Sequence, residues 1–180
     1  MKRVLTPMLR YQAWANQALL QALSTMEEGR AATGLAIMRH VLEVEAVFAR
    51  RLAQAQPLPL PAETTGASDA GVSEVTTRLA ALDSWFFEVL AGFDDGELGQ
   101  PIAFTFLDGD RGFMTPAEIL THLVLHGGYH RGEAGRSMIA QAGQPPWDTF
   151  AVFLHEDEPG RRVQGASLHE VGVGTANARL

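Results

Sequence analysis

The fold is decided by residues 115–143, which read TPAEILTHLVLHGGYHRGEAGRSMIAQAG and predict one long helix. Thr115 can cap the first turn, Pro116 suits the first helical position, and Glu118 completes a capping box. Gly143, followed by two prolines, indicates the end of the helix. At 1.5 Å per residue, a helix of this length extends about 40 Å. It carries three of the six histidines in the chain, so a site is expected on it.

The three histidines, His122, His126 and His130, are spaced four residues apart. Residues at this spacing lie about 6 Å apart along the axis and 40° around it, so two imidazoles can converge on one ion. Residues eight apart are separated by about 12 Å, too far for two bonds near 2.1 Å. A metal site would therefore use one adjacent pair and a third ligand from another helix. His40 is the obvious donor, because the remaining histidines, His155 and His169, lie outside the predicted bundle helices.

A single histidine is more often a packed or surface residue than a ligand. The i,i+4 pair together with one histidine on a facing helix favours a metal site. Four glycines in the same helix support a site, because each one costs about 1 kcal/mol relative to alanine in a helix interior. These glycines are Gly127, Gly128, Gly132 and Gly135, and we expect another group to approach the helix closely beside them.

Composition limits the possible classes of protein. With 180 residues and 46% hydrophobic content, the chain fits one globular domain. A net charge of −7 argues against a general nucleic-acid surface. There is no cysteine, which excludes disulfides, thiolate metal sites and a protein sulfur nucleophile. No apolar run has transmembrane length and the N-terminus does not resemble a signal peptide, so we expect a soluble cytoplasmic protein without membrane partners.

Three further helices are predicted upstream of the long one, over residues 6–28, 33–55 and 72–93, each with apolar residues at helical spacing. Residues 101–114 alternate and contain an Asp-Gly turn signal, which predicts a small β-hairpin. A short helical turn that covers one end of the bundle is expected from Trp147. The fold class is therefore all-α, a four-helix bundle over residues 1–157 with a hairpin between helices three and four, followed by a polar tail over 158–180. The proline-rich loop from Gln56 and the hairpin allow a non-neighbouring topology.

The stretch LTHLVLHGGYHRGEAGRSMIAQAGQPPWDTFAVFL, preceded by YQAWANQALLQAL near the N-terminus, resembles the DinB/YfiT family over about residues 4–155. Its most specific element is a histidine, three residues, then His-Arg-Gly. The resemblance implies a four-helix bundle, often dimeric, with a divalent metal held by three histidines. Carried over to this chain, these are His40, His126 and His130. Zinc and nickel are both implied, and the donor set does not choose between them.

Three neutral imidazoles leave a divalent ion its charge and an open position, as in catalytic sites. The better-characterised relatives transfer low-molecular-weight thiols to electrophiles or isomerise with a thiol cofactor, and others are described as hydrolases. We therefore expect a metal-dependent thiol transferase acting on a small-molecule substrate. The alternatives are a hydrolase that uses water at the same ligands, and a non-catalytic, stress-related metal-binding bundle with a sealed site. A ferritin-like di-iron bundle is disfavoured, since its Glu-x-x-His order is reversed here.

Two carboxylates, Glu133 and Glu43, each follow a predicted ligand by three residues; each is a candidate to accept a hydrogen bond from that ligand or to act as a general base. A solvated helix face is the competing interpretation for both. Arg131 and Arg136 could pair with the carboxylates of a thiol cofactor, although a surface role is more common for arginine. Tyr129 fits either a wall of the site or packing. We expect His122 to be packed rather than bound to the ion.

Overall fold

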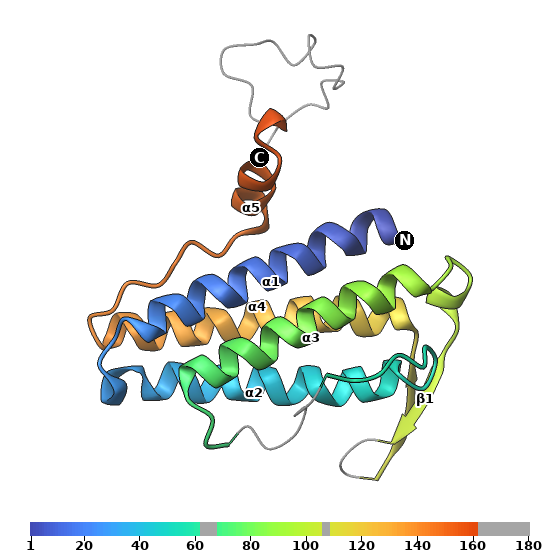
Figure 1. Ribbon diagram of the computed structural model, residues 1–180, viewed down its shortest axis with the longest axis horizontal. Helices are drawn as coiled ribbons and strands as arrows, with labels where there is room; N and C mark the ends of the chain where they lie inside the picture. Colours follow the sequence, from blue (N-terminus) through green and yellow to red (C-terminus); the bar gives the residue numbers. More distant parts are fainter. Residues whose placement is uncertain (62–67, 106–108, 162–180) are drawn as a thin grey trace.

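The computed structural model describes residues 1–61, 68–105 and 109–161 of the chain. Its four long helices are α1 (Lys2–Ser24), α2 (Glu28–Leu52), α3 (Val72–Gly92) and α4 (Pro116–Ala140). They run alongside one another in a bundle, with α5 (Phe150–Asp157) standing beside α1 (Figure 1). The predicted all-α bundle with a small hairpin is confirmed.

The main helix contacts join α1 to α3 and α4, and α2 to the same two helices. Consecutive helices α1 and α2 therefore lie across the bundle from each other, as do α3 and α4. This is the non-neighbouring topology that the long loop and the hairpin permit. It places α2 directly against α4, which brings His40 to the helix that carries the histidine ladder.

The core is built from the apolar stripe that each helix turns inward. Each stripe is interrupted by one or two polar residues that are nevertheless buried. We call these residues the buried polar layer: Gln12 and Asn16 on α1, Glu45 on α2, Asp83 on α3 and Arg131 on α4.

The predicted start and end of the first helix are wrong. α1 begins at Lys2, and Pro7 lies inside it. The missing N–H of Pro7 leaves only the carbonyl of Arg3 without its helical donor, and Arg3 is exposed to water, so the disruption is small. α1 ends at Ser24 rather than at residue 28, and the Ser24 and Thr25 hydroxyls donate to the carbonyls of Gln21 and Ala22 in its last turn.

Gly29 instead lies in the first turn of α2, which begins at Glu28 and ends at Leu52 rather than spanning 33–55. The third helix, α3, closely follows its predicted range.

The predicted capping box of α4 is confirmed. The Glu118 N–H donates to Thr115 Oγ1 over 3.2 Å, and the Thr115 N–H donates to Glu118 Oε2 over 2.8 Å. The helix ends at Ala140, three residues before the predicted end. Ala142 adopts a φ of 56°, and the Gly143 N–H then closes onto the Met138 carbonyl over 2.8 Å.

The hairpin pairs β1 (Ile102–Thr105) with β2 (Arg111–Met114) in antiparallel register, and Gly109 has a φ of 94° in the turn. Two short 3-10 helices, η1 (Glu97–Gly99) and η2 (Pro159–Arg161), complete the elements. The predicted helical turn near Trp147 is α5, which begins later because Thr149 caps it. α5 packs its Phe150 and Phe153 rings against the side of α1 rather than over an end of the bundle. The predicted tail falls almost wholly outside the described residues.

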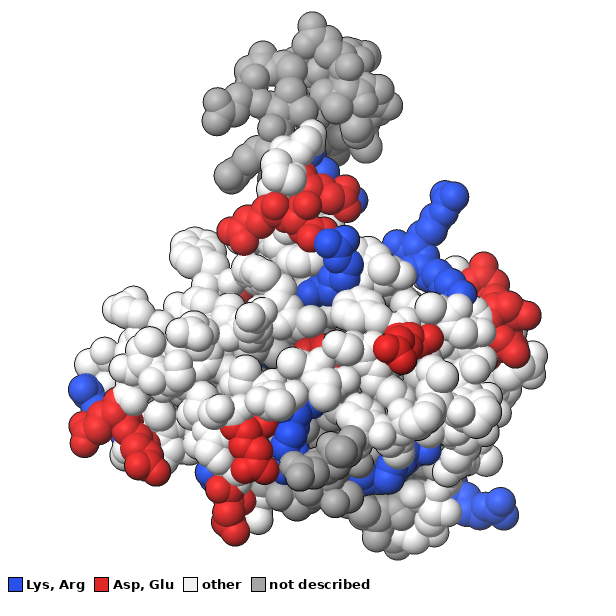
Figure 2. All heavy atoms as spheres, viewed as in Figure 1, with Lys and Arg blue, Asp and Glu red and all other residues white. Residues whose placement is uncertain are grey.

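The face shown in Figure 2 carries acidic and basic side chains in separate small groups, with no broad basic patch. This distribution agrees with the net charge of −7. Among the described helices, none combines the length and apolar character that a membrane span requires.

Candidate metal centre

Three histidines from two helices converge on the α2–α4 side of the bundle. His40, His126 and His130 each offer one ring nitrogen, and these nitrogens all lie within 4.8 Å of one another. The ring centroids of His126 and His130 are 4.4 Å apart, as expected for residues one turn apart on one helix face. The His40 ring lies 5.2 Å from that of His126 and 4.7 Å from that of His130. This is a group of side chains that could hold a metal ion.

The cluster is open to solvent. His40 is exposed, and His126 and His130 are half-buried. A small molecule can therefore reach the three imidazoles from outside. The sealed, apolar surroundings expected of a non-catalytic relic are not found at His40.

Glu133 orients His130. Its Oε2 lies 2.6 Å from His130 Nδ1, one helical turn along α4. A carboxylate accepts, so the neutral imidazole carries its proton on Nδ1 and leaves the Nε2 lone pair free for an ion.

His126 remains neutral at ordinary pH. Burial, together with the neighbouring His130, His122 and His40, lowers its pKa to about 4. Its Nδ1 is buried and has no hydrogen-bond partner among the described residues. A half-buried imidazole with an unused nitrogen, beside two other imidazoles, suits the borderline donor set that zinc and nickel accept. The residues present therefore fit a divalent ion.

His122 lies at the other end of the ladder and is not among the converging nitrogens. Its ring packs on Phe48, with 4.9 Å between centroids. Burial lowers its pKa, and the charge of Arg51 adds to the effect. This placement is the packed position expected from the sequence.

The comparison with protein families gives one result: the model of the DinB family matches residues 1–162. The chain belongs to the DinB family. Neither the curated proteins nor the solved structures gave a match to it. Family membership and the three-histidine cluster are together compatible with a metal-binding protein.

The other predicted site residues of this DinB-family chain differ in placement. Glu43 is exposed on α2 and makes no hydrogen bond or ion pair with any described residue. The Tyr129 ring is 67% exposed and packs edge-on against His130, with 5.0 Å between centroids. Arg136 is exposed and lies about 120° around α4 from His130, given 100° per residue. It does not share the face of the histidines.

The expectation of a surface position for Arg131 is wrong. Only 2% of this residue is exposed, and its guanidinium donates to Asp148 over 2.8 Å and to Asn16 over 3.0 Å. The Tyr11 hydroxyl donates to the same Asp148 carboxylate. Arg131 is therefore already bound within the protein, facing the core rather than the histidines.

The glycines of α4 serve this core contact more than the site. A Cβ at Gly127 would lie 2.9 Å from an Arg131 nitrogen and 3.1 Å from Gln12 Oε1. A Cβ at Gly135 would meet Pro145 at 3.3 Å, whereas one at Gly132 would meet nothing within 4 Å. The close approach predicted from the glycines exists, but the approaching groups belong to the protein.

The buried polar layer was missed by the sequence analysis. The signal was present, because each of its residues occupies a core position in an otherwise apolar stripe. Gln12 Nε2 donates to Glu45 Oε1 over 2.8 Å, while Glu45 Oε2 has no partner among the described residues. Burial, reinforced by the charge of Asp83, raises the pKa of Glu45 well above its ordinary value.

Proposed function

We propose that this protein is a divalent-metal-dependent enzyme that transfers a low-molecular-weight thiol to an electrophilic substrate. The observation that carries the proposal is the convergence of His40, His126 and His130 at a position open to solvent. An all-imidazole set keeps the full charge of the ion and leaves room for an outside ligand, which is typical of catalytic rather than structural sites.

A divalent ion held by these histidines would supply the positive charge that keeps a thiol in its nucleophilic thiolate form at neutral pH. The absence of cysteine from the chain means that the sulfur must come from a separate molecule. His126 contributes a nitrogen that burial keeps unprotonated. Glu133 holds His130 in the tautomer that presents Nε2.

Two carboxylates are proposed to handle the proton that a thiol gives up. Glu133 is already in contact with the cluster through His130 Nδ1. Glu43 lies one turn beyond His40 and is exposed, so it can reach a molecule that approaches from solvent. We assign no cofactor carboxylate to Arg131, because its donors are used inside the protein.

A hydrolase that uses water in place of the thiol is the second candidate, since a solvent-open site admits either molecule. A non-catalytic metal-binding role is disfavoured by the same exposure. The choice between the two enzymes depends on which co-reactant accelerates turnover.

The experiment uses metal-loaded protein, an activated aryl halide as a generic electrophile, and a panel of biological thiols. Metal content is measured beforehand, and the variants are His126→Ala and, as a matched control, His155→Ala, whose exposed ring lies outside the cluster. The proposal expects faster conjugation with at least one thiol in the wild type and in His155→Ala than in His126→Ala. Equal rates for all three proteins with every thiol would refute the transferase. Ester or amide hydrolysis without thiol, lost in His126→Ala, would establish the hydrolase instead.

A further inference from the structure

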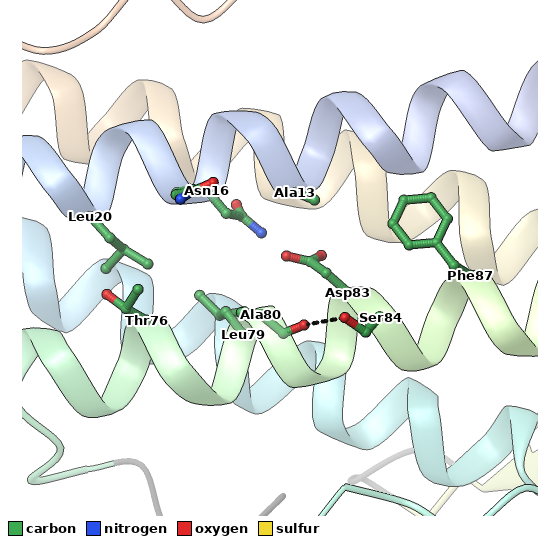
Figure 3. Close-up of a pocket in the computed structure, with 10 residues that line it drawn as sticks. Ala13, Asn16, Leu20, Thr76, Leu79, Ala80, Asp83, Ser84 and Phe87 are labelled. Atoms are coloured by element: carbon green, nitrogen blue, oxygen red, sulfur yellow. Dashed lines mark hydrogen bonds between the residues drawn. The ribbon is translucent and has the colours of Figure 1, made fainter.

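A cavity lies on the opposite side of the bundle from the histidine cluster. It has a volume of about 250 Å³ and lies between α1 and α3. Figure 3 shows Leu20 at one end and Phe87 at the other, with Asn16, Leu79 and Asp83 between them. The histidine cluster lies between α2 and α4, so the two sites do not share lining residues.

The polar part of this cavity has unused hydrogen-bonding groups. Asn16 is 1% exposed, and its Oδ1 accepts from Arg131, whereas its Nδ2 has no partner within hydrogen-bond geometry among the described residues. In Figure 3 the Asn16 amide and the Asp83 carboxylate point toward one another across the cavity. A buried donor without a partner is costly, so a ligand or water molecule is expected to satisfy it.

Asp83 is a buried carboxyl without a cation of its own. It is 8% exposed, and no ion pair joins it to any described residue. The nearest cation of the layer, Arg131, is bound to Asp148. Burial therefore raises the pKa of Asp83 to about 7, although the charge of Arg131 and the amide of Asn16 act in the opposite direction. The cavity thus offers one carboxylate acceptor and one amide donor beside an apolar wall.

We propose that this cavity binds a small primary amine that carries a hydroxyl or carbonyl oxygen next to its ammonium group, such as an amino alcohol. The ammonium group donates to Asp83, and the neighbouring oxygen accepts from Asn16 Nδ2. The hydrocarbon part packs against the apolar residues that line the cavity beside Asp83. A metal cation fits less well, because among the described residues that line the cavity Asp83 is the one carboxylate, and hard cations take six or more oxygen ligands.

The test measures binding of four small molecules to the full-length protein by calorimetry or ligand-observed NMR, in the presence of a chelator. The probes are 2-aminobutan-1-ol, n-butylamine, butan-1-ol and butyrate, which share a hydrocarbon body and differ in their polar groups. We expect 2-aminobutan-1-ol to bind in the millimolar range and butan-1-ol to bind at least about tenfold more weakly, since it lacks the charge-assisted hydrogen bond. n-Butylamine should lie between them, and butyrate should not bind.

Two variants locate the site. Asp83→Asn keeps the shape of the side chain and should weaken amine binding about tenfold or more. Ala13→Leu keeps the carboxylate but fills space in the cavity, and should also reduce binding. Asp69→Asn removes an exposed carboxylate elsewhere on the chain and should leave binding unchanged. Equal affinity of the wild type for the amine and the alcohol would overturn the proposal, whether or not the variants fold. Unchanged amine binding in folded Asp83→Asn, or no amine binding at all, would also overturn it.

Discussion

Replacing Asp83 with asparagine is expected to stabilise the protein at neutral pH. Asp83 is buried in the polar layer, facing Asn16 of α1, Glu45 of α2 and Arg131 of α4. Burial raises its pKa from 3.8 to about 7 in the folded protein. The folded protein therefore retains a proton that the unfolded chain has already released at the same pH.

The sign and the pH range follow from that difference. A raised pKa in the folded state contributes stability that is fully present below about pH 4 and is lost as the pH rises through about 7. The change from 3.8 to about 7 corresponds to about 4 kcal/mol at pH 7 and about 2 kcal/mol at pH 5. Asparagine has the same shape and does not titrate. The free energy of unfolding of Asp83→Asn should therefore exceed that of the wild type by about 4 kcal/mol at pH 7 and about 2 kcal/mol at pH 5.

The assay is urea unfolding followed by far-ultraviolet circular dichroism, at several pH values between about 4 and 7. A chelator is present throughout, so that pH-dependent metal binding at the histidines does not contribute. Asp69→Asn serves as the control, because it removes an exposed carboxylate outside the buried polar layer.

The informative quantity is how the difference in free energy of unfolding between Asp83→Asn and the wild type changes with pH. A difference that stays constant within about 0.5 kcal/mol over this range would show that Asp83 ionises at its ordinary pH in the folded protein. A wild type that is more stable than the variant at pH 7 would show that the carboxylate is paired. Either result refutes the reasoning about the buried layer.

Other expected outcomes concern the histidines and α4. His126→Ala should lose most bound divalent metal by elemental analysis while His122→Ala keeps it; loss of metal in His122→Ala together with retention in His130→Ala would mean that the ion is bound by His122 and His126 instead. Glu133→Gln should weaken metal affinity about 10- to 100-fold in a chelator competition, since it perturbs the partner of His130 Nδ1. Gly132→Ala should raise the free energy of unfolding by up to about 1 kcal/mol, whereas Gly127→Ala, with its Cβ 2.9 Å from Arg131, should lower it; equal effects would contradict the packing. Two chains of 19.5 kDa are expected to associate, given the exposed Leu125, Tyr129 and Ile139 on α4, and a monomer mass in sedimentation at micromolar concentration would count against this.

Local features of the structure could be predicted well from the sequence. The start of α4 follows from Thr115, Pro116 and Glu118, whose interactions involve only neighbours in the chain. The convergence of His126 and His130 follows from helical spacing alone. The prediction of His40 as the third ligand also assumed that its helix packs against α4. The contact between α2 and α4 agrees with this assumption.

Features that depend on packing between helices were missed or misplaced. Pro7 indicates a helix start by local rules, yet burial of Leu5 and Leu9 extends α1 past it. Arg131 is predicted on the surface by residue type, yet Asn16 and Asp148, distant in sequence, supply partners that allow its burial. No pattern within one helix shows that five polar residues from four helices will meet.

The segment HGGYHRG, residues 126–132, shows how one stretch of helix serves both sides of α4. His126 and His130 are four residues apart and present their rings toward α2. Gly127 and Arg131 have the same spacing, offset by one residue, and are turned about 100° toward α1. The missing Cβ at Gly127 admits the Arg131 guanidinium and Gln12. Arg131 in turn fixes Asn16, whose free amide faces the cavity between α1 and α3. The glycine next to the first ligand is therefore needed for the core contact, and its effect on the histidines is indirect, through the position of the helix that carries them.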